Sequence, residues 1–319
     1  MSASELPLFT CGTLLDPAAQ RRLFGRALPT EPAELLGHDL AQAPLADPAA
    51  PGAEGRSAQP GLVRRVRGGV PGALLRPDAA QLAAADASEA PARVRRRVLV
   101  RPAEGEPTPA WASVDANPLA GAQRIAVVGD SIAYGRITAD GGWAAALGAW
   151  HIAREEQEHR LYQLAYPGTT VRRIREHILP ELTTRKADTV VLSAGINDLL
   201  LDGTAPGALV ELVAGLCADL EARGIRPLVL GPVWLDAGRT EEVLGHRPDP
   251  AVLAEYRERL ASWAGSTRRD HRDPWPVLEG RAQRVRTDGL HPDAEGHRLL
   301  ARWLLDLAAA PGEAWRDAD

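Results

Sequence analysis

Hydrophobic and polar residues follow different patterns in the two parts of this chain. Up to about position 115, short apolar runs are bounded by glycine, proline and small polar residues, which is typical of strands joined by turns. Pro17 predicts the first turn of a short helix, where the fixed φ of proline is favoured. We expect strands over 6–10, 70–75 and 94–100, helices over 16–24 and 79–85, and a loop rich in alanine, proline and glycine over 41–61.

Strand-length apolar runs alternate with helix-length segments in the second part. This alternation indicates a parallel sheet that is covered by helices on both faces. Because crossover connections are right-handed, it predicts an α/β three-layer sandwich with its site at the carboxyl ends of the strands. The expected strands are 125–128, 161–166, 189–192, 227–230 and a weak fifth near 276–278, and the expected helices are 143–158, 171–179, 208–222, 251–263 and 294–308.

The length of the chain indicates two domains, since 319 residues exceed one typical core. Pro118, Gly121 and the small residues near them separate the two patterns. We therefore expect a first domain over 1–117, a linker over 118–123 and a second domain over 124–319.

Composition and charge narrow the classes of function. Apolar residues make up 45% of the chain and charged residues 25%, as in ordinary globular domains. The net charge of -5 argues against a nucleic-acid partner, because phosphate binding requires a basic surface. No signal peptide and no apolar run of bilayer length is visible, so we expect a cytoplasmic protein without membrane contact. The two cysteines, Cys11 and Cys217, provide no disulfide framework and no zinc motif, and Cys217 lies in a helical pattern that predicts a core position.

Three residues at the expected strand ends form a candidate catalytic triad. Ser131 follows the first strand of the second part, where its hydroxyl would lie at the mouth of the sheet. A serine hydroxyl is a weak nucleophile until a base removes its proton, and His291 is the candidate base. Asp288 precedes His291 by three residues and is placed to hold the imidazole in one tautomer.

Attack on an acyl carbon creates an oxyanion that needs hydrogen-bond donors. The backbone N–H groups of Ser131 and Gly168 and the side-chain amide of Asn197 are the candidates, since Gly168 and Asn197 also follow expected strands. Loss of one such donor typically costs about 2.7–4 kcal/mol of transition-state stabilisation.

The segment from about 124 to 310 resembles the SGNH (GDSL-type) hydrolases. Four blocks carry the resemblance, in order "GDSIAYG", "YPGTT", "AGIND" and "DGLHPDAEGH". It implies a Ser131 nucleophile, an oxyanion hole with Gly168 and Asn197, and an Asp288/His291 pair, acting without a metal on small-molecule esters or thioesters. One departure is Pro167, where the family more often has a polar residue, and it bears on the shape of the pocket. Substrate selection is expected in the loops 199–207 and 234–249.

Two alternatives compete with this interpretation. A Gly-Asp-Ser turn and an Asp-Gly-x-His-Pro helix cap are each common, although four blocks at four strand ends favour catalysis. His151, Glu155 and His159 are spaced by four on a predicted helix and have side chains that zinc can use. Neighbouring charged residues favour a solvated face with i,i+4 ion pairs instead, so we expect neither a metal nor another cofactor.

The first part holds a second candidate site. The turn Cys11, Gly12, Thr13 and Leu14 follows a strand and exposes backbone N–H groups that can hold a carboxylate. Glu89 is a candidate general acid/base if the fold brings it to this turn. A role of Cys11 as a nucleophile has no base nearby in sequence, so a buried or loop-lining thiol is expected.

These segments, over about 6 to 117, resemble the gamma-glutamylcyclotransferase (AIG2-like) family. The matching pieces are "LFTCGTLLDP", "LFGRAL", "VPGALL" and "DASEAPARVRRRVLV". The resemblance implies an α+β small mixed barrel, a glutamyl moiety bound at 11–14 and a proton carried by Glu89 during release of 5-oxoproline. Cys11 and Arg93 stand where the family usually has tyrosines, and either change can remove a substrate contact.

Three hypotheses follow for the whole chain. The first is an acyl hydrolase fused to a working cyclotransferase that acts on gamma-glutamyl amines, as in the tailoring of a metabolite or natural product. The second is an acyltransferase with the same Ser131 acyl-enzyme, because both reactions share that intermediate. In the third, the first domain is a non-catalytic module that binds substrate or a partner.

Overall fold

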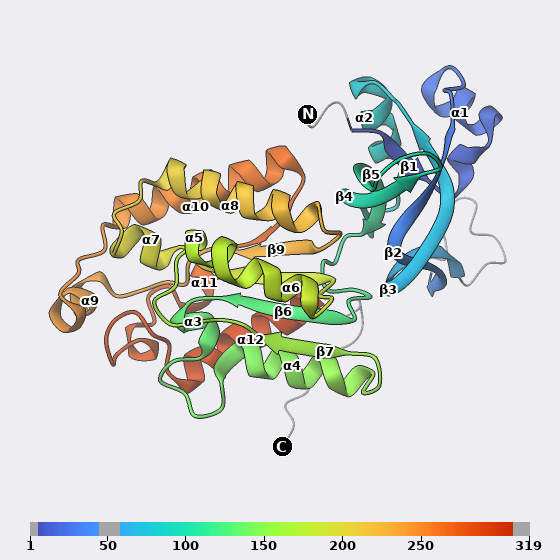
Figure 1. Cartoon of the computed structure of the whole chain (residues 1–319). Helices are drawn as coiled ribbons and strands as arrows, with labels where there is room; N and C mark the ends of the chain where they lie inside the picture. The colour runs from blue at the N-terminus through green and yellow to red at the C-terminus, as the bar shows by residue number, and fades with distance from the viewer. Residues whose placement is uncertain (1–5, 45–57, 309–319) are drawn as a thin grey trace. The chain divides into compact units, whose positions relative to one another are not determined.

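The computed structural model describes residues 6–44 and 58–308, and these residues form two compact units. The first unit extends to Ala122 and includes Glu221–Gly224, and the second comprises Gln123–Leu220 and the chain from Ile225 onward. Figure 1 shows a barrel in the first unit and a sheet between helices in the second. The predicted fold, an α+β barrel followed by an α/β sandwich, is confirmed.

The barrel of the first unit has five strands in the order β1-β3-β2-β4-β5. All neighbours are antiparallel except β1 and β5, which close the barrel in parallel through Leu8 and Trp111. The elements are β1 (Leu8–Thr10), a 3-10 turn (Thr13–Leu15), α1 (Pro17–Phe24), β2 (Glu31–Pro44), β3 (Ala58–Leu75), α2 (Ala79–Ser88), β4 (Arg93–Pro102) and β5 (Thr108–Asp115).

Two parts of the sequence prediction for this unit are wrong. The loop expected over 41–61 overlaps the ends of β2 and β3, which pair from Glu31 with Leu74 to Pro44 with Ala58, while 45–57 lie outside the described residues. No strand was expected over β2 or β5. Their glycines, prolines and charged residues weaken the strand pattern, and barrel pairing supplies the stability that local propensity lacks.

Apolar side chains from all five strands fill the barrel. Leu35 and Val100 are fully buried in this core, and Cys11 packs against its edge. A second cluster joins the barrel to α2, where Leu82 packs with Leu75 and Trp111. The turn that follows β1 therefore lies against a rigid scaffold, since Leu14 packs on this second cluster.

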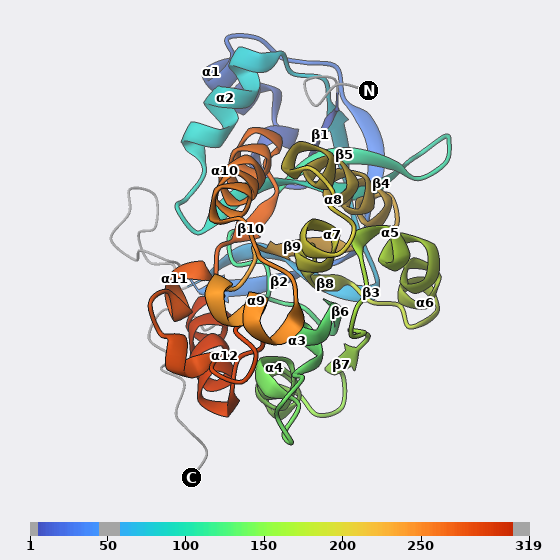
Figure 2. The same cartoon turned by 90° about the vertical axis from the view of Figure 1, so that its left-hand side faces the viewer.

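The second unit is a five-stranded sheet in the order β10-β9-β8-β6-β7, with every neighbouring pair parallel. Figures 1 and 2 show α4 and α12 on one face and α8 and α10 on the other. The strands are β6 (Arg124–Gly129), β7 (Arg160–Gln163), β8 (Thr189–Ser193), β9 (Arg226–Leu230) and β10 (Asp270–Arg272). The helices are α3 (Ser131–Tyr134), α4 (Gly142–Arg154), α5 (Val171–Arg173), a π turn (Ile174–Ile178), α6 (Leu179–Thr184), α7 (Ile196–Leu200), α8 (Pro206–Glu221), α9 (Ala237–Leu244), α10 (Pro250–Thr267), α11 (Trp275–Leu278), a 3-10 turn (Ala282–Arg284) and α12 (Ala294–Ala308).

The predicted fifth strand was misplaced. Residues 276–278 belong to α11, and the edge strand β10 is formed instead by Asp270–Arg272, which pairs with Leu228–Leu230. In this edge strand of three residues, two side chains are only half-buried. The strand therefore does not require apolar residues, and the sequence Asp-His-Arg shows no apolar pattern that would predict it. Cys217 is fully buried in α8, as its pattern predicted.

Within the residues that the structure describes, every helix is too short or too polar to cross a bilayer.

Candidate active site

Ser131 begins α3 directly after β6, an inner strand that pairs with β7 and β8. Asp130 caps this helix, because its Oδ1 accepts the Ile132 N–H at 2.9 Å. Gly129, the last residue of β6, touches the backbone of Ser193 so closely that a Cβ would collide with the Ser193 carbonyl. This close approach holds Ser131 at the carboxyl end of the sheet, where its side chain is buried.

His291 and Asp288 lie beside Ser131. Asp288 Oδ1 accepts the backbone N–H groups of Leu290 at 3.0 Å and His291 at 2.9 Å, and Oδ2 lies 2.6 Å from His291 Nδ1. Since a carboxylate only accepts, the Nδ1 proton points to Asp288 and leaves Nε2 as an acceptor. That Nε2 lies 2.8 Å from the Ser131 hydroxyl oxygen, so the serine proton faces a free lone pair.

The pKa values of the two groups suit a neutral imidazole beside a carboxylate. Burial lowers the pKa of His291 below its ordinary value, and the hydrogen bond to Asp288 opposes that shift. Burial alone would raise the pKa of Asp288, but hydrogen bonds from His291 and Leu290 outweigh it and keep the pKa below its ordinary value. His291 is therefore unprotonated at neutral pH and can accept a proton.

Three hydrogen-bond donors lie on the segments that surround Ser131. The Asn197 amide donates one proton to the Thr169 carbonyl at 2.9 Å, which fixes the side chain and leaves its second proton free. Gly168 adopts φ 77°, a left-handed conformation that glycine tolerates, and space is open where its Cβ would be. The backbone N–H groups of Gly168 and Ser131 donate to no acceptor among the described residues.

Asp198 joins the segments that carry Gly168 and Asn197. Its two carboxylate oxygens lie 3.2 Å from the Val171 N–H, and its own carbonyl accepts the Thr204 N–H at 2.8 Å. Asp198 is buried, and burial raises its pKa. The block "AGIND" contains Asp198, but the motif alone assigns it no role.

The loop that carries Asp288 and His291 is supported by α9. Asp236 N–H donates to the Gly289 carbonyl at 2.8 Å, and the Arg239 guanidinium donates to the Arg286 carbonyl at 3.2 Å. Gly289 adopts φ 80° and has no room for a Cβ, because Thr240 is in contact with it. The segment 234–249 was expected to be a loop, but it contains the helix α9.

Arg136 is a site neighbour that sequence reasoning missed. Its backbone N–H donates to the Ser131 carbonyl at 3.0 Å, and its exposed guanidinium has no bonding partner among the described residues. Its positive charge contributes to the lowered pKa of His291, after burial. The block "GDSIAYG" ends just before Arg136, so no motif marked it.

The alternative metal site is not assembled. His151 is buried, with Nε2 3.1 Å from the Gln123 carbonyl, and its ring stacks on His159 at 4.2 Å. Glu155 is exposed at the end of α4. No cluster of three possible metal ligands occurs among the residues that the structure describes. The expectation that this stretch is a solvated helical face was wrong for His151, which the fold buries.

In the first unit, Gly12 leads into the 3-10 turn Thr13–Leu15. The N–H groups of Thr13 and Leu14 donate to no acceptor among the described residues. Cys11 is half-buried, and burial raises the pKa of its thiol while the Arg93 charge opposes that shift. The Arg93 guanidinium also donates to the Ser113 carbonyl at 2.8 Å.

Glu89 is the cap residue directly after α2 and has an exposed side chain. Its backbone N–H donates to the Asp86 carbonyl at 3.3 Å, and its carboxylate bonds to no described residue. No direct bond joins Glu89 to the 11–14 turn. The helix α2, which Glu89 follows, is connected to the turn through packing, because Leu82 and Ala85 lie in one cluster with Leu14.

Two family models match this chain. Residues 127–299 match the GDSL-like Lipase/Acylhydrolase family, and residues 8–129 match Gamma-glutamyl cyclotransferase, AIG2-like. No curated protein matches significantly.

Three similar solved structures are distant from this chain in sequence. An acetylxylan esterase from Geobacillus stearothermophilus is 17% identical, with 62% of this chain and 97% of that chain covered and a TM-score of 0.49. A lipase/acylhydrolase from Enterococcus faecalis is 21% identical, with 60% and 100% covered and a TM-score of 0.48. LAE5, an alpha/beta hydrolase enzyme from the metagenome of Lake Arreo, Spain, is 20% identical, with 58% and 94% covered and a TM-score of 0.47.

The family match over 127–299 covers more than half of the 319 residues and includes Ser131, Asn197 and His291. This chain therefore belongs to the GDSL-like lipase/acylhydrolase family, as a serine esterase that carries an AIG2-like domain before it.

Proposed function

We propose that the second unit hydrolyses a small-molecule ester or thioester with Ser131 as nucleophile, His291 as general base and Asp288 as the residue that orients it. The observation that carries the proposal is the continuous series of short contacts from Asp288 through His291 to the Ser131 hydroxyl. The free donors at Ser131, Gly168 and Asn197 complete the arrangement. A water molecule is the only further reactant needed.

In acylation, the Ser131 oxygen forms a bond to the acyl carbon while its proton passes to His291 Nε2. The carbonyl oxygen becomes an oxyanion, which the N–H groups of Ser131 and Gly168 and the amide of Asn197 stabilise. The imidazolium then gives its proton to the leaving oxygen or sulfur as the bond from the acyl carbon to that atom breaks. Asp288 stabilises the imidazolium and remains ionised.

Deacylation repeats these steps with water. His291 takes a proton from the attacking water, whose oxygen forms a bond to the acyl carbon, and a second oxyanion forms at the same donors. As the bond to the Ser131 oxygen breaks, His291 returns the proton to the serine. An alcohol or amine acceptor in place of water gives acyl transfer, the alternative that shares the same acyl-enzyme.

Covalent labelling tests the nucleophile. A fluorophosphonate probe is expected to modify Ser131, as mapped by mass spectrometry, and Ser131→Ala should lose labelling and at least about 10³-fold of ester hydrolysis. Ser266→Ala is the matched control, because Ser266 is exposed on α10 and donates only to the Trp263 carbonyl. Labelling at another serine, or full activity of Ser131→Ala, would contradict the proposal.

Product analysis separates hydrolysis from transfer. With an activated ester and a large excess of a competing alcohol or amine, hydrolysis predicts free acid as the main product. A new ester or amide that forms in preference to the acid, and only with intact Ser131, would favour the acyltransferase.

For the first unit we propose gamma-glutamylcyclotransferase activity. The match to the AIG2-like family, the free N–H groups of Thr13 and Leu14 and the exposed Glu89 carboxylate support it. The glutamyl α-amine nitrogen forms a bond to its own γ-carbonyl carbon, and the bond to the departing amine breaks. Glu89 takes the proton from the attacking nitrogen and delivers it to the departing nitrogen, so the products are 5-oxoproline and a free amine.

Release of 5-oxoproline tests this second activity. A panel of gamma-glutamyl amines should yield 5-oxoproline with the whole protein, and the yield should fall in Glu89→Gln but remain in Glu104→Gln, whose carboxylate is also exposed. If wild type releases none, the first unit is better explained as a binding module. In that case substitution at Arg93, which lies by Cys11, should weaken substrate binding without altering turnover of a small generic ester.

The two activities together are expected to process one metabolite or natural product, with residues 1–117 and 124–319 as separate functional domains. A cytoplasmic location and the lack of any cofactor requirement remain expectations from sequence. A substrate that carries both an ester and a gamma-glutamyl amide tests this expectation. Its products are compared between wild type and variants in which either Ser131 or Glu89 is replaced, which shows whether both sites act on one molecule.

A further inference from the structure

His297 is a buried histidine that the proposed reaction does not use. It lies in the first turn of α12, and only 2% of its surface is exposed. The Trp143 nitrogen lies 3.4 Å from His297 Nδ1 and donates its proton to it, so the neutral ring carries its own proton on Nε2. Nε2 is buried and bonds to no described residue. A buried polar atom without a partner is uncommon in native proteins and calls for an explanation.

The His297 ring rests on one end of the loop 135–141, which joins α3 to α4. The first residue of α4, Gly142, adopts φ 64°, and a Cβ there would lie 2.7 Å from His297 Nδ1. The ring therefore touches the backbone at the point where the loop enters α4. Figure 2 shows α4 and α12 side by side, and the two helices pack together.

The other end of the loop is bound to the nucleophile segment. The Arg136 N–H donates to the Ser131 carbonyl at 3.0 Å. The two ends also touch each other, because a Cβ on Gly135 would lie only 2.5 Å from the Gly141 carbonyl. A displacement where the loop enters α4 is therefore passed on to Gly135 and Arg136.

The loop contains a strained residue. Ile137 adopts φ 74°, a left-handed conformation that is rare for a β-branched side chain. Such a conformation persists only where its surroundings enforce it. The Ile137 side chain is exposed, so the contacts at the two ends of the loop supply that restraint.

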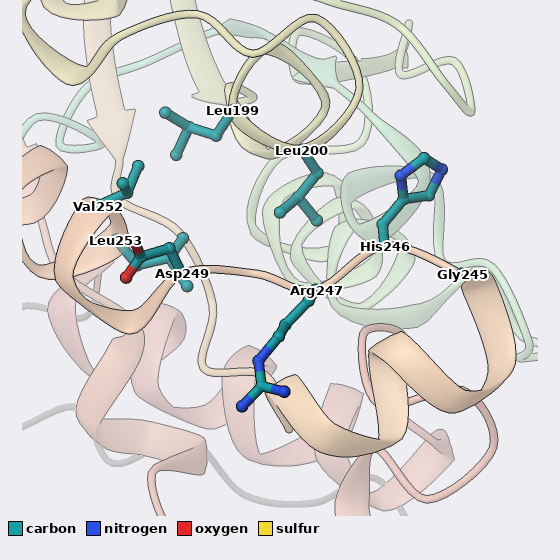
Figure 3. Close-up of a pocket in the computed structure, with 8 residues that line it drawn as sticks. All are labelled: Leu199, Leu200, Gly245, His246, Arg247, Asp249, Val252 and Leu253. Atoms are coloured by element: carbon teal, nitrogen blue, oxygen red, sulfur yellow. The ribbon is translucent and has the colours of Figure 1, made fainter.

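The loop also carries the positive charge of Arg136. This guanidinium is exposed and bonds to no described residue, and its charge helps to lower the pKa of His291. Arg247, on the segment after α9, is instead paired with Glu241 at 3.0 Å, and Figure 3 shows it directed away from Leu200. Because the Arg136 side chain has no such partner, the position of its charge depends on the loop.

We propose that His297 is a positioning residue, which fixes the loop 135–141 against α4 and thereby keeps the Arg136 charge close to His291. The inference rests on the proposed function of the triad and adds a residue that acts through the loop. The block "DGLHPDAEGH" ends at His297, but the motif alone assigns it no role.

His297 affects the charge around the catalytic base only through its neighbours. The charged and titratable groups that face it are Asp140, His291, Asp293 and Arg136. Burial lowers the pKa of His297 to about 4, so its ring is neutral above about pH 5. A neutral side chain in its place therefore leaves the charge unchanged over that range. A change in the titration of His291 then reports a displaced neighbour.

Profiles of kcat/KM for p-nitrophenyl acetate against pH test the proposal in the full protein, at low ionic strength so that salt does not screen the charge. His297→Leu removes the acceptor of the Trp143 N–H and should move the acid limb to higher pH by about 0.3 or more, the effect of one unit charge at about 10 Å in water. In the Arg136→Gln background, the same substitution should cause no further move. His297→Asn, which keeps an acceptor near the position of Nδ1, should stay closer to the wild-type limb.

His151→Leu is the matched control. His151 is buried to the same extent, and burial lowers its pKa to about 4 as well, but its Nε2 lies 3.1 Å from the Gln123 carbonyl, away from the loop 135–141. Its replacement should leave the acid limb in place. Gly142→Ala is a second test variant that retains the histidine, because the new Cβ pushes on the His297 ring, and it should move the limb in the same direction.

The outcomes separate this proposal from the proposed function. If hydrolysis does not depend on Ser131, the esterase assignment itself fails. If it does, an unchanged limb in His297→Leu and Gly142→Ala, or an equal move in the Arg136→Gln background, shows that His297 does not position Arg136. An equal move in His151→Leu would indicate a general loss of packing and would also overturn the proposal. If circular dichroism shows that His297→Leu is unfolded, His297→Asn and Gly142→Ala decide the question in the same way.

Discussion

His291 Nε2 lies 2.8 Å from the Ser131 hydroxyl oxygen, although 160 positions separate the two residues in the chain. The parallel sheet explains the meeting, because Ser131 follows the inner strand β6 and His291 lies in the loop before α12, which packs against α4. Each residue is held by its own backbone contacts, Ser131 through Asp130 and His291 through Asp288. The contact therefore needs no movement of either segment.

Asp288→Asn should lower kcat by about 10³- to 10⁴-fold. The amide group can donate to Nδ1, which would shift the imidazole proton to Nε2 and remove the acceptor that faces Ser131. Steady-state hydrolysis of an activated ester measures the loss. Asp306→Asn on exposed α12 surface is the control and should retain activity, and retention in Asp288→Asn as well would rule out an orienting role.

The activity should fall at acid pH with an apparent pKa below about 6.5, the ordinary value for histidine. Burial lowers the pKa of His291, so its neutral, basic form persists to lower pH than in a solvated imidazole. Protonation removes the acceptor for the Ser131 proton, which makes the low-pH side the inactive one. A profile of kcat/KM between pH 4 and 9 locates the limb, and an apparent pKa above 7 would contradict this assignment.

Arg136→Gln should move that acid limb to higher pH. The Arg136 charge disfavours the imidazolium form of His291, so its removal raises the pKa of His291. Arg173→Gln is the matched control, because Arg173 is an exposed arginine whose charge is not among the causes of the His291 shift. If the acid limb has the same apparent pKa in wild type and Arg136→Gln, burial and Asp288 alone set the pKa of His291.

Asn197→Ala should lower kcat by about 10²- to 10³-fold with little change in KM, as expected when one oxyanion donor is lost. The side chain is held by the Thr169 carbonyl in the resting protein, so the second proton is already directed before the substrate binds. A matched test is Asn197→Asp, which replaces the donor by an acceptor and should be at least as inactive. An effect on KM alone would indicate that Asn197 only binds substrate.

Sequence patterns predicted the second unit well and the first unit less well. The strands of the parallel sheet are continuous apolar runs, such as Val127 and Val128 in β6, because both faces are buried. The barrel strand β2 carries Glu31, Glu34 and Asp39 on a half-solvated surface, so its strand character depends on pairing with β3. Local patterns do not contain that pairing.

In the candidate site too, residues next to recognisable elements were predictable from sequence, and residues that act through contacts distant in sequence were not. Ser131, Gly168, Asn197 and His291 each follow or precede a recognisable element, so sequence placed them at one edge of the sheet. Arg136 could not be found in this way, because its importance arises from distance to His291 and from an unpaired charge. The support of Gly289 by α9 was equally hidden, since it depends on contact between segments about fifty positions apart.

The buried imidazole of His297 should make the protein lose stability as pH falls from about 6.5 to 4. Burial lowers its pKa to about 4, while the unfolded chain has the ordinary value of about 6.5. Between these values the unfolded state binds more protons, so the free energy of unfolding rises with pH and the contribution is complete above 6.5. Asp130, whose pKa is raised to about 7 by burial, acts in the opposite direction, so only the difference between wild type and a His297 variant isolates the contribution of His297.

In His297→Gln, the free energy of unfolding should change less with pH than in wild type, by at most about 3 kcal/mol between pH 4 and 6.5. Urea unfolding at pH 4.5, 5.5 and 7 measures it, with the exposed His177→Gln as control. Parallel curves for wild type and His297→Gln would mean that folding does not lower the pKa of His297.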